Sequence, residues 1–202
     1  MAIVFSLGML YNKINIGGEV MKTYTIIGGV NGCGKSSLTG SLKIALRDMG
    51  IIIDPYKMAA DMGCDNYEAG KLAIERMEQC LEKGVCFTQE STLAGGYTKK
   101  LAAKAVEKGY YVRLYYVGLD TKEECVKRIA HRVANGGHAI DTKDVERRFL
   151  GRFKALQGVL AYCNEAVFMD NRNGFVPVGE YRNGELIALT KYPPLWLQEM
   201  MK

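Results

Sequence analysis

The sequence predicts an α/β fold in which helices flank a parallel sheet. Short apolar runs typical of buried strands alternate with amphipathic stretches typical of helices through the first 170 residues. Parallel strands require such crossover helices, so this rhythm indicates a sheet covered on both faces. A glycine-rich stretch, IIGGVNGCGKSSLTG at 26–40, directly follows the first of these strands. The length of 202 residues suits a single domain.

The first half of the chain is predicted to contain three strand–helix units. Aromatic and β-branched residues mark the strands, and Gly50, Gly84 and Gly109 follow the helices, as glycine commonly does at helix ends. In order, the predicted elements are a strand at Lys22–Ile27, a helix at Ser36–Asp48, a strand at Ile51–Asp54 ended by Pro55, a helix at Tyr67–Lys83, a strand at Val85–Glu90 and a helix at Tyr97–Lys108.

The second half continues the alternation of strands and helices and then ends in a predicted hairpin and a short helix. Thr121 with Glu124 three residues later has the spacing of a capping box, which predicts where a helix begins. An Asn-Gly pair in YRNGELIALT predicts a small C-terminal hairpin. The predicted elements are a strand at Tyr110–Gly118, a helix at Thr121–Val133, a loop in ANGGHAI, a basic helix at Thr142–Phe153, a strand at Ala166–Asp170, the hairpin, and a short helix in PPLWLQEMM.

Residues 1–20 are predicted to lie outside the domain. Met21 begins MKTYTIIGG, a natural start for a first strand, so we expect residues 1–20 to be a non-native N-terminal extension. A genuine N-terminal strand or arm is the alternative. The apolar run from Ala2 to Leu10 is too short to span a bilayer, and no basic residues precede it. The predicted domain is therefore 21–202, and we expect no membrane association.

The composition is compatible with anionic ligands. The chain has 27 basic and 22 acidic residues, a formal net charge of +5, which suits small anions as well as nucleic acid. We expect no nucleic-acid partner, because we do not expect the basic helix to offer aromatic base-stacking platforms. Six cysteines without a C-x-x-C pair and two histidines give no zinc spacing, which predicts reduced thiols in a cytoplasmic protein.

The glycine-rich stretch matches a phosphate-binding loop in full. Gly29 to Ser36 has the pattern G-x-x-x-x-G-K-[ST] between a predicted strand and a predicted helix. Positions without a Cβ let backbone N–H groups approach a phosphate chain, and the following helix adds its free N–H groups. We expect Lys35 near the β- and γ-phosphates of ATP and Ser36 at Mg²⁺. The candidate nucleotide-binding residues are Gly29, Asn31, Gly32, Cys33, Gly34, Lys35, Ser36 and Ser37.

Acidic residues close three of the predicted strands. Asp54 closes the second strand, Glu90 closes the third, and Asp120 follows the fourth. In an open α/β sheet the chemistry lies at the carboxyl ends of the strands. A carboxylate there can accept the proton of an attacking hydroxyl or hold Mg²⁺. We expect Asp54 and Glu90 in the site, with Glu90 also a candidate metal ligand, and Asp120 to belong to the start of a helix.

Two basic segments are predicted to form a lid at about residues 121–155. Arg128 and Arg132 are four residues apart and so share one helical face. Arginines brought over a phosphoryl group neutralise the charge that develops during transfer. Helices joined by a Gly-Gly loop could close and exclude water. We expect Lys127 and Arg152, by contrast, to lie on solvated faces.

Six sequence motifs follow one another between residues 22 and 175. They are TIIGGVNGCGKSSL, AGKLAIERMEQCLEKGVCFTQESTLAGG, KGYYVRLYYVGLD, RIAHRVANGGHAI, RRF and DN. Over residues 22–175 the chain resembles the zeta-toxin-like P-loop kinases of bacteria. Zeta toxins phosphorylate a hydroxyl of UDP-N-acetylglucosamine and are held inactive by a small antitoxin. The resemblance implies Lys35 and Ser36 at ATP–Mg²⁺, Glu90 at the substrate or the metal, and Arg128 and Arg132 on the lid.

One departure from the family pattern concerns the catalytic base. Such kinases usually place an aspartate two residues after the residue that closes the second strand, where this chain has Tyr56. Tyrosine is a poor base at neutral pH because its usual pKa is about 10. Either Asp54 takes over as the base, or the substrate site has changed, or activity is weak.

Two other functions fit parts of the sequence. Leu93–Tyr97 imitates the signature loop of ABC ATPases, and the strand before Asp120 imitates their Walker B strand. An ATP-binding switch module without turnover is the second alternative, and the missing aspartate at Tyr56 supports it. The prediction we favour is an ATP-dependent kinase that acts on a hydroxyl of a small molecule. The sequence does not identify the acceptor.

Overall fold

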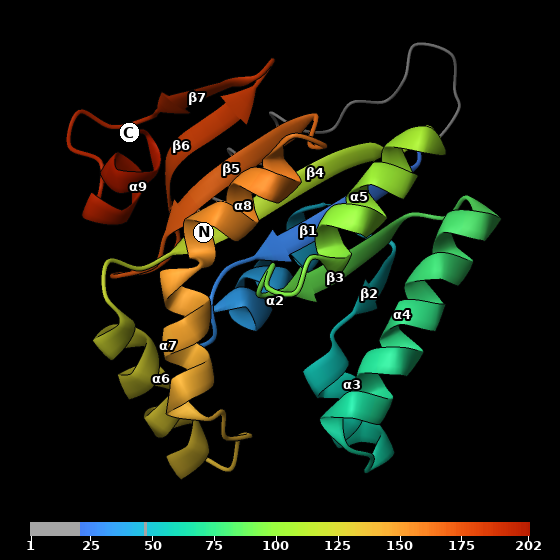
Figure 1. Cartoon of the computed structure of the whole chain (residues 1–202), viewed down its shortest axis with the longest axis horizontal. Coiled ribbons are helices and arrows are strands. Elements are labelled where there is room, and N and C mark those ends of the chain that lie inside the picture. The colour runs from blue at the N-terminus through green and yellow to red at the C-terminus, as the bar shows by residue number, and fades with distance from the viewer. Residues whose placement is uncertain (1–20, 47) are drawn as a thin grey trace.

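The computed structural model describes residues 21–46 and 48–202, and within them the strands form one seven-stranded sheet (Figure 1). The predicted extension at 1–20 lies outside the described residues. The sheet order is β2–β3–β1–β4–β5–β6–β7. The strands are β1 (Thr23–Gly28), β2 (Ile51–Ile53), β3 (Phe87–Ser91), β4 (Tyr111–Gly118), β5 (Glu165–Asp170), β6 (Val176–Arg182) and β7 (Glu185–Ala188).

Strands β1 to β5 run parallel, which confirms the predicted parallel sheet. β1 lies between β3 and β4, while β2 pairs with β3 and β5 pairs with β4. β6 and β7 continue the same sheet in antiparallel pairing. The predicted hairpin turn is confirmed at Asn183 and Gly184, whose φ values of 54° and 85° are those an Asn-Gly turn requires.

Helices cover both faces of the sheet, and each face has its own apolar core (Figure 1). Successive strand residues point to opposite faces, so Ile26 joins one core and Ile27 the other. Within the described residues, every helix is too short or too polar to cross a membrane. The helices are α2 (Lys35–Ala45), α3 (Pro55–Met62), α4 (Asn66–Lys83), α5 (Tyr97–Glu107), α6 (Lys122–Ala134), α7 (Thr142–Leu150), α8 (Arg152–Leu160) and α9 (Leu195–Met200).

The structure contains a helix, α3, that the sequence analysis did not predict. Asp54 is its N-cap, and its Oδ1 accepts the backbone N–H groups of Tyr56 at 3.0 Å and Lys57 at 3.4 Å. Pro55 occupies the first helical position, where its missing N–H costs no hydrogen bond. This cap fixes the Asp54 carboxylate at the carboxyl edge of the sheet.

Two predicted helix boundaries are wrong. The helix predicted at Ser36–Asp48 ends at Ala45, because Leu46 is extended with φ −112° and ψ 129° and packs into the core. The helix predicted at Thr142–Phe153 is two helices, because the backbone leaves the helical conformation at Gly151. The second of them, α8, continues to Leu160, beyond the predicted end of the lid.

The prediction that Arg152 is solvated is also wrong. Only 11% of its side chain is exposed. The guanidinium lies over the rings of Phe149 and Phe153, 3.8 and 4.1 Å from their centroids, and pairs with Glu199 at 3.2 Å. Arg152 therefore connects α7 and α8 to the C-terminal helix α9. Lys127 is exposed, as predicted.

Candidate active site

The phosphate-binding motif forms the turn between β1 and α2. At two of its glycines, other parts of the chain lie too close to the backbone for a Cβ atom. Gly29 has φ +142°, and a Cβ there would lie 2.5 Å from the carbonyl oxygen of Val117. Gly34 has φ +105°, and its Cβ would lie 2.4 Å from the amide nitrogen of Asn171. Any larger residue at either position would displace the backbone of the loop. The pattern is thus required by backbone geometry as well as by phosphate binding.

Lys35 lies over this loop. Its Nζ donates to the carbonyl oxygens of Gly29 at 2.9 Å and Val30 at 3.2 Å, so the ammonium is held at the concave side of the turn. Cys33 is buried beneath the loop, and burial raises the pKa of its thiol. A neutral, buried thiol reacts poorly, which agrees with a role for Cys33 as a small packing residue.

Glu90 is held beside the loop by two hydroxyl groups. Its Oε2 accepts from Ser36 Oγ at 2.8 Å, and its Oε1 accepts from Thr39 Oγ1 at 2.6 Å. The side chain is 8% exposed, and burial, together with the nearby charge of Asp54, raises the pKa of its carboxyl. These contacts place a carboxylate and a hydroxyl oxygen next to the phosphate-binding turn.

The oxygens of Ser36 and Glu90 fit Mg²⁺. Magnesium takes hard oxygen ligands and is commonly held by one or two protein oxygens together with substrate phosphates. In the described part of the chain, no three His, Cys, Asp or Glu side chains gather into a self-sufficient metal site. A metal here would therefore depend on the phosphate oxygens of a nucleotide, as in other phosphate-binding loops.

Tyr56, where the resemblance expects an aspartate, makes contacts of its own. Its hydroxyl accepts from Arg148 Nη1 at 3.2 Å, and its ring stacks on His138 with centroids 4.7 Å apart. The same Arg148 nitrogen donates to Asn31 Oδ1 at 2.8 Å. Tyr56 thus joins α3 to the lid helix α7 and to the phosphate-binding loop, while Asp54 lines the cavity beside it.

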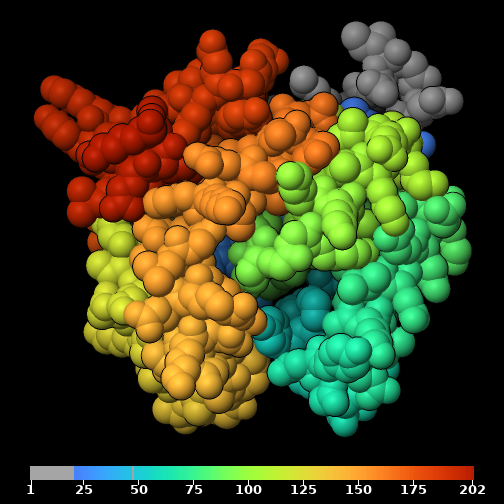
Figure 2. Space-filling model, in the orientation of Figure 1, coloured from blue at the N-terminus to red at the C-terminus, as the bar shows by residue number. Residues whose placement is uncertain are grey.

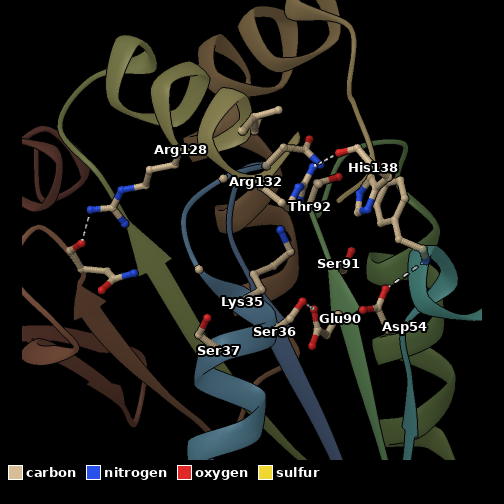
Figure 3. A pocket seen from close by; sticks show the side chains of 16 residues that line it. Lys35, Ser36, Ser37, Asp54, Glu90, Ser91, Thr92, Arg128, Arg132 and His138 are labelled. Carbon is tan, nitrogen blue, oxygen red and sulfur yellow. Dashed lines mark hydrogen bonds between the residues drawn. The ribbon is translucent and has the colours of Figure 1, made fainter. Parts of the chain in front are cut away.

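The two arginines predicted to lie on a lid, Arg128 and Arg132, differ in their surroundings. Arg132 Nη2 donates to the carbonyl oxygen of His138 at 2.9 Å, and Figure 3 shows this pair above Lys35. Arg128 instead donates from Nε to Glu124 at 2.7 Å and from Nη2 to the carbonyl oxygen of Asn171 at 2.6 Å. Arg132 therefore lies over the centre of the site, and Arg128 lies at its side.

Partial desolvation and the positive charge of Arg132 lower the pKa of the His138 imidazole, which favours the neutral ring. A neutral ring stacked on Tyr56 can take part in hydrogen bonds without adding charge to the site.

One cavity of about 380 Å³ is lined by Lys35, Ser36, Asp54, Tyr56, Glu90, Arg128, Arg132 and His138. The face shown in Figure 2 is hollowed between α7, α3 and the start of α5. Inside the cavity, Lys35 and Ser36 face Glu90 and Asp54, with Arg132 and His138 above them (Figure 3). The cavity therefore combines a phosphate-binding turn, two carboxylates and the lid arginines within the space of a small ligand.

Most predicted site residues are brought together, and two of them, Gly29 and Cys33, are not part of the cavity wall. The lining includes Asn31, Gly32, Gly34, Lys35, Ser36, Ser37, Asp54, Glu90, Arg128 and Arg132. Gly29 and Cys33 lie behind the loop. Asp120 accepts the backbone N–H of Trp196 at 3.0 Å and pairs with Arg172 at 3.1 Å, so it anchors the C-terminal segment.

Some residues that line the cavity have no role predicted from the sequence, namely Ser91, Thr92, Ile129, His138 and Asn171. Arg148, from the basic segment predicted to form a lid, contacts the cavity wall through Asn31 and Tyr56. His138 follows the Gly-Gly pair of the lid loop and Thr92 follows Glu90 by two positions, so motif context could have indicated both. Nothing local marks Asn171, whose side chain donates to the Cys33 carbonyl oxygen at 2.8 Å.

Comparison with known sequences finds a similar bacterial protein. No family model matches the chain. An uncharacterized protein of Haemophilus influenzae is 33% identical over 126 residues, which is 60% of this chain and 88% of that protein.

Comparison with solved structures finds the same fold in chains of low sequence identity. The crystal structure of the AvrRxo1-ORF1–ORF2 complex with ATP matches with a TM-score of 0.68 and 14% identity, over 99% of this chain and 67% of that chain. A chain of the PezAT chromosomal toxin–antitoxin system of Streptococcus pneumoniae matches with a TM-score of 0.55 and 18% identity, over 87% of this chain and 78% of that chain. The chain thus has a zeta-toxin-like P-loop kinase fold.

Proposed function

We propose that this chain, which belongs to one family with the Haemophilus influenzae protein, is an ATP-dependent kinase that phosphorylates a hydroxyl group of a small molecule. The observation that carries the proposal is the convergence of Lys35, Asp54 and Glu90 on one cavity with the phosphate-binding loop. A solved structure with ATP has the same fold, which supports the choice of nucleotide.

In the proposed complex the loop amides and Lys35 hold the β- and γ-phosphates. Ser36 and Glu90 would hold Mg²⁺, which would supply positive charge to those phosphates. Arg132, above Lys35, is placed to neutralise charge that develops on the transferred group. The site thus gathers cationic and hydrogen-bonding groups around the γ-phosphate.

Asp54 is the proposed general base. It takes the proton of the acceptor hydroxyl while the acceptor oxygen bonds to the γ-phosphorus, and the bond from that phosphorus to the bridging oxygen of ADP breaks. Asp54 is preferred to Tyr56 because the Tyr56 hydroxyl already accepts a hydrogen bond from Arg148 and its ring is stacked on His138.

A nucleotide sugar such as UDP-N-acetylglucosamine is the proposed type of acceptor, following the resemblance to zeta toxins. An antitoxin is a proposed protein partner, and chains of toxin–antitoxin systems among the structural neighbours support it. The cytoplasmic location, the domain limits of 21–202 and the lid at about 121–155 also remain proposals.

A non-catalytic ATP-binding switch is the second candidate, and the contacts of Tyr56 favour it. Arg148 ties Tyr56 to Asn31 of the phosphate-binding loop, so nucleotide binding could be coupled to the position of the lid without transfer. An ABC-type ATPase stays the third alternative and would hydrolyse ATP without an acceptor.

One experiment separates these functions. The full chain is incubated with labelled ATP, Mg²⁺ and a panel of nucleotide sugars and simple sugars, and the products are resolved by mass. A kinase adds one phosphoryl group to an acceptor. ADP formation that is independent of every acceptor would favour the ABC-type ATPase. Tight ATP binding by calorimetry without turnover would favour the switch, and absence of ATP binding would contradict all three.

A further inference from the structure

Tyr56, in the first turn of α3, brings a hydroxyl group of the chain itself into the candidate active site. It lines the same cavity as Lys35 and Asp54. It stands two residues after Asp54, at the position where the resemblance expects an aspartate. A side chain that ends in a possible phosphate acceptor therefore shares the space in which phosphoryl transfer is proposed.

The Tyr56 side chain is held in one orientation. Its ring stacks on the imidazole of His138, with centroids 4.7 Å apart and planes 12° apart. Its hydroxyl accepts a hydrogen bond from Arg148 Nη1 at 3.2 Å. A side chain that is fixed at both its ring and its hydroxyl has little freedom left to lose when it reacts, which favours a reaction within the molecule.

Arg148 brings this hydroxyl close to the phosphate-binding loop. The same Nη1 atom donates to Asn31 Oδ1 at 2.8 Å, and its two hydrogens suffice for both acceptors. A single nitrogen thus lies between the Tyr56 hydroxyl and a residue of the loop that would hold the γ-phosphate. The hydroxyl is therefore next to the group to be transferred.

The proton of the Tyr56 hydroxyl is free to leave. In the part of the chain that the structure describes, the hydroxyl accepts from Arg148 and donates to no other group. Asp54 uses Oδ1 to cap α3, and its Oδ2 receives no hydrogen bond from the described residues. This free carboxylate oxygen can take the phenol proton, directly or through one water molecule.

Positive charge surrounds the hydroxyl. Arg148 contacts it directly. Partial burial lowers the pKa of the Arg132 guanidinium, while the charges of Tyr56 and Asp54 act in the opposite direction, so both groups lie within electrostatic reach of Arg132. Guanidinium groups stabilise the charge that develops on a transferred phosphoryl group and bind a phosphate ester once it has formed.

The other hydroxyl groups of the cavity wall are less well placed for transfer. Ser36 Oγ donates to Glu90 at 2.8 Å, and Ser91 Oγ shares a hydrogen bond of 2.8 Å with another hydroxyl. Ser37 and Thr92 also line the cavity, but neither is hydrogen-bonded to an arginine of the described chain. The tyrosine hydroxyl is thus the favoured acceptor among them.

Residues of the lid wall cover Tyr56. His138 lies against its ring, Arg148 contacts its hydroxyl, and the side chain is half-buried. A second molecule would have to displace these contacts to bring its own phosphate-binding loop to this hydroxyl. Transfer to Tyr56 is therefore expected within one chain.

We propose that the chain transfers the γ-phosphoryl group of ATP to its own Tyr56. The hydroxyl oxygen bonds to the γ-phosphorus, the bond from that phosphorus to the bridging oxygen of ADP breaks, and the hydroxyl proton passes to Asp54. The products are ADP and a phosphotyrosine that Arg148 can bind. The inference rests on the proposed kinase function, because the same loop would present the ATP.

Mass spectrometry of the full chain tests the inference. The protein is incubated with ATP and Mg²⁺ without any acceptor, and its intact mass and peptide map are compared with those of Lys35→Ala, which should stay unmodified. Tyr56→Phe removes the hydroxyl and keeps the ring. Tyr67→Phe is the matched control, because Tyr67 is an exposed tyrosine at the start of α4 and lies outside the cavity wall.

Wild type and Tyr67→Phe are expected to gain one phosphoryl group per chain, on the peptide that contains Tyr56. Tyr56→Phe should gain none, although it should still bind ATP in calorimetry. Equal incorporation into Tyr56→Phe would overturn the inference. So would a phosphoryl group found on Ser37, Thr92 or any other residue in place of Tyr56.

A mixing experiment tests whether the transfer is intramolecular. Lys35→Ala chains, which keep Tyr56, are incubated with Tyr56→Phe chains, which keep the phosphate-binding loop, and intact mass distinguishes the two. The Lys35→Ala chains should remain unmodified, and the rate constant in wild type should be independent of protein concentration. A phosphoryl group on Tyr56 of the Lys35→Ala chains would contradict transfer of a chain to its own tyrosine.

The inference and the proposed function fail differently. Wild-type protein that phosphorylates an acceptor of the panel but carries no phosphoryl group on Tyr56 would overturn the inference and leave the kinase function standing. Modification of Tyr56 without a product from any acceptor would support the inference and contradict the proposed acceptors. Wild-type protein that binds no ATP would overturn both.

Discussion

The two walls of the candidate active site are built in different ways. The phosphate wall, Gly29–Ser37 with Glu90, comes from one continuous turn and a neighbouring strand end. The lid wall consists of α6, α7 and the loop between them. It contacts the phosphate-binding turn and α3 through hydrogen bonds of its side chains. Its contacts from Arg148 to Asn31 and Tyr56 span 117 and 92 residues of sequence.

The walls also differ in burial. In the phosphate wall Asn31 and Glu90 are buried and only the serines Ser36 and Ser37 of the turn's end are exposed, whereas in the lid wall His138 is exposed and Arg132 is half-buried. Polar contacts between partly exposed groups contribute little stability each. We therefore expect the phosphate wall to be rigid before a ligand binds and the lid wall to rearrange at low energetic cost.

The largest expected effect tests whether the phosphate wall supplies the chemistry. Lys35→Ala should lower ATP turnover about a thousandfold, because a preorganised charge at the transferred phosphate is lost. Lys43→Ala, an exposed lysine later on α2, is the control and should be near wild type. Steady-state ADP release measures both. A Lys35→Ala protein with more than about a tenth of wild-type turnover would remove the phosphate wall from the mechanism.

The next effect concerns the base, which lies between the walls. Asp54→Asn should reduce phosphoryl transfer about a hundredfold with ATP binding retained, because asparagine keeps the helix cap but accepts a proton poorly. Tyr56→Phe should reduce transfer only a few-fold, since the lost hydroxyl accepts one hydrogen bond within the described residues, from Arg148. Rapid-quench measurements of transfer compare them. The reverse order of effects would assign the base to Tyr56.

A smaller effect should separate the two lid arginines. Arg132→Gln should lower kcat about tenfold at unchanged ATP affinity, because Arg132 lies over the site. Arg128→Gln should mainly lower the melting temperature, by about 3 °C, because its guanidinium binds Glu124 and the Asn171 carbonyl oxygen. Equal losses of kcat in both variants would contradict the different positions of these side chains.

The smallest effect is a pH dependence of stability at Glu90. The raised pKa of the Glu90 carboxyl means that the carboxyl binds its proton more tightly in the folded chain than in the unfolded chain. Wild type is therefore relatively stabilised below the usual carboxyl pKa and loses that stabilisation as the pH rises through the raised value. The Glu90→Gln protein does not ionise there, so its melting temperature relative to wild type should rise between about pH 4 and pH 7. A constant difference over this range would contradict the burial argument.

The phosphate wall was largely predictable because its information is local. The eight positions of the motif contain both the glycines that the turn requires and the lysine, and Asp54 and Glu90 end strands whose apolar runs are evident. Helix α3 could also have been predicted, since Asp54 followed by Pro55 is a helix-start signal. The break between α7 and α8 at Gly151 was less evident, because a single glycine is tolerated within a helical pattern.

The phosphate-binding turn, the parallel strands and the hairpin turn at Asn183–Gly184 could be predicted from the amino-acid sequence, because each depends on residues that are neighbours in the chain. The packing of the helices, in contrast, sets which arginines face the cavity, buries Arg152 and brings Lys99 and Lys154 to a second cavity with Arg148. These depend on how helices distant in sequence pack against one sheet, and no local pattern of residues encodes such distances.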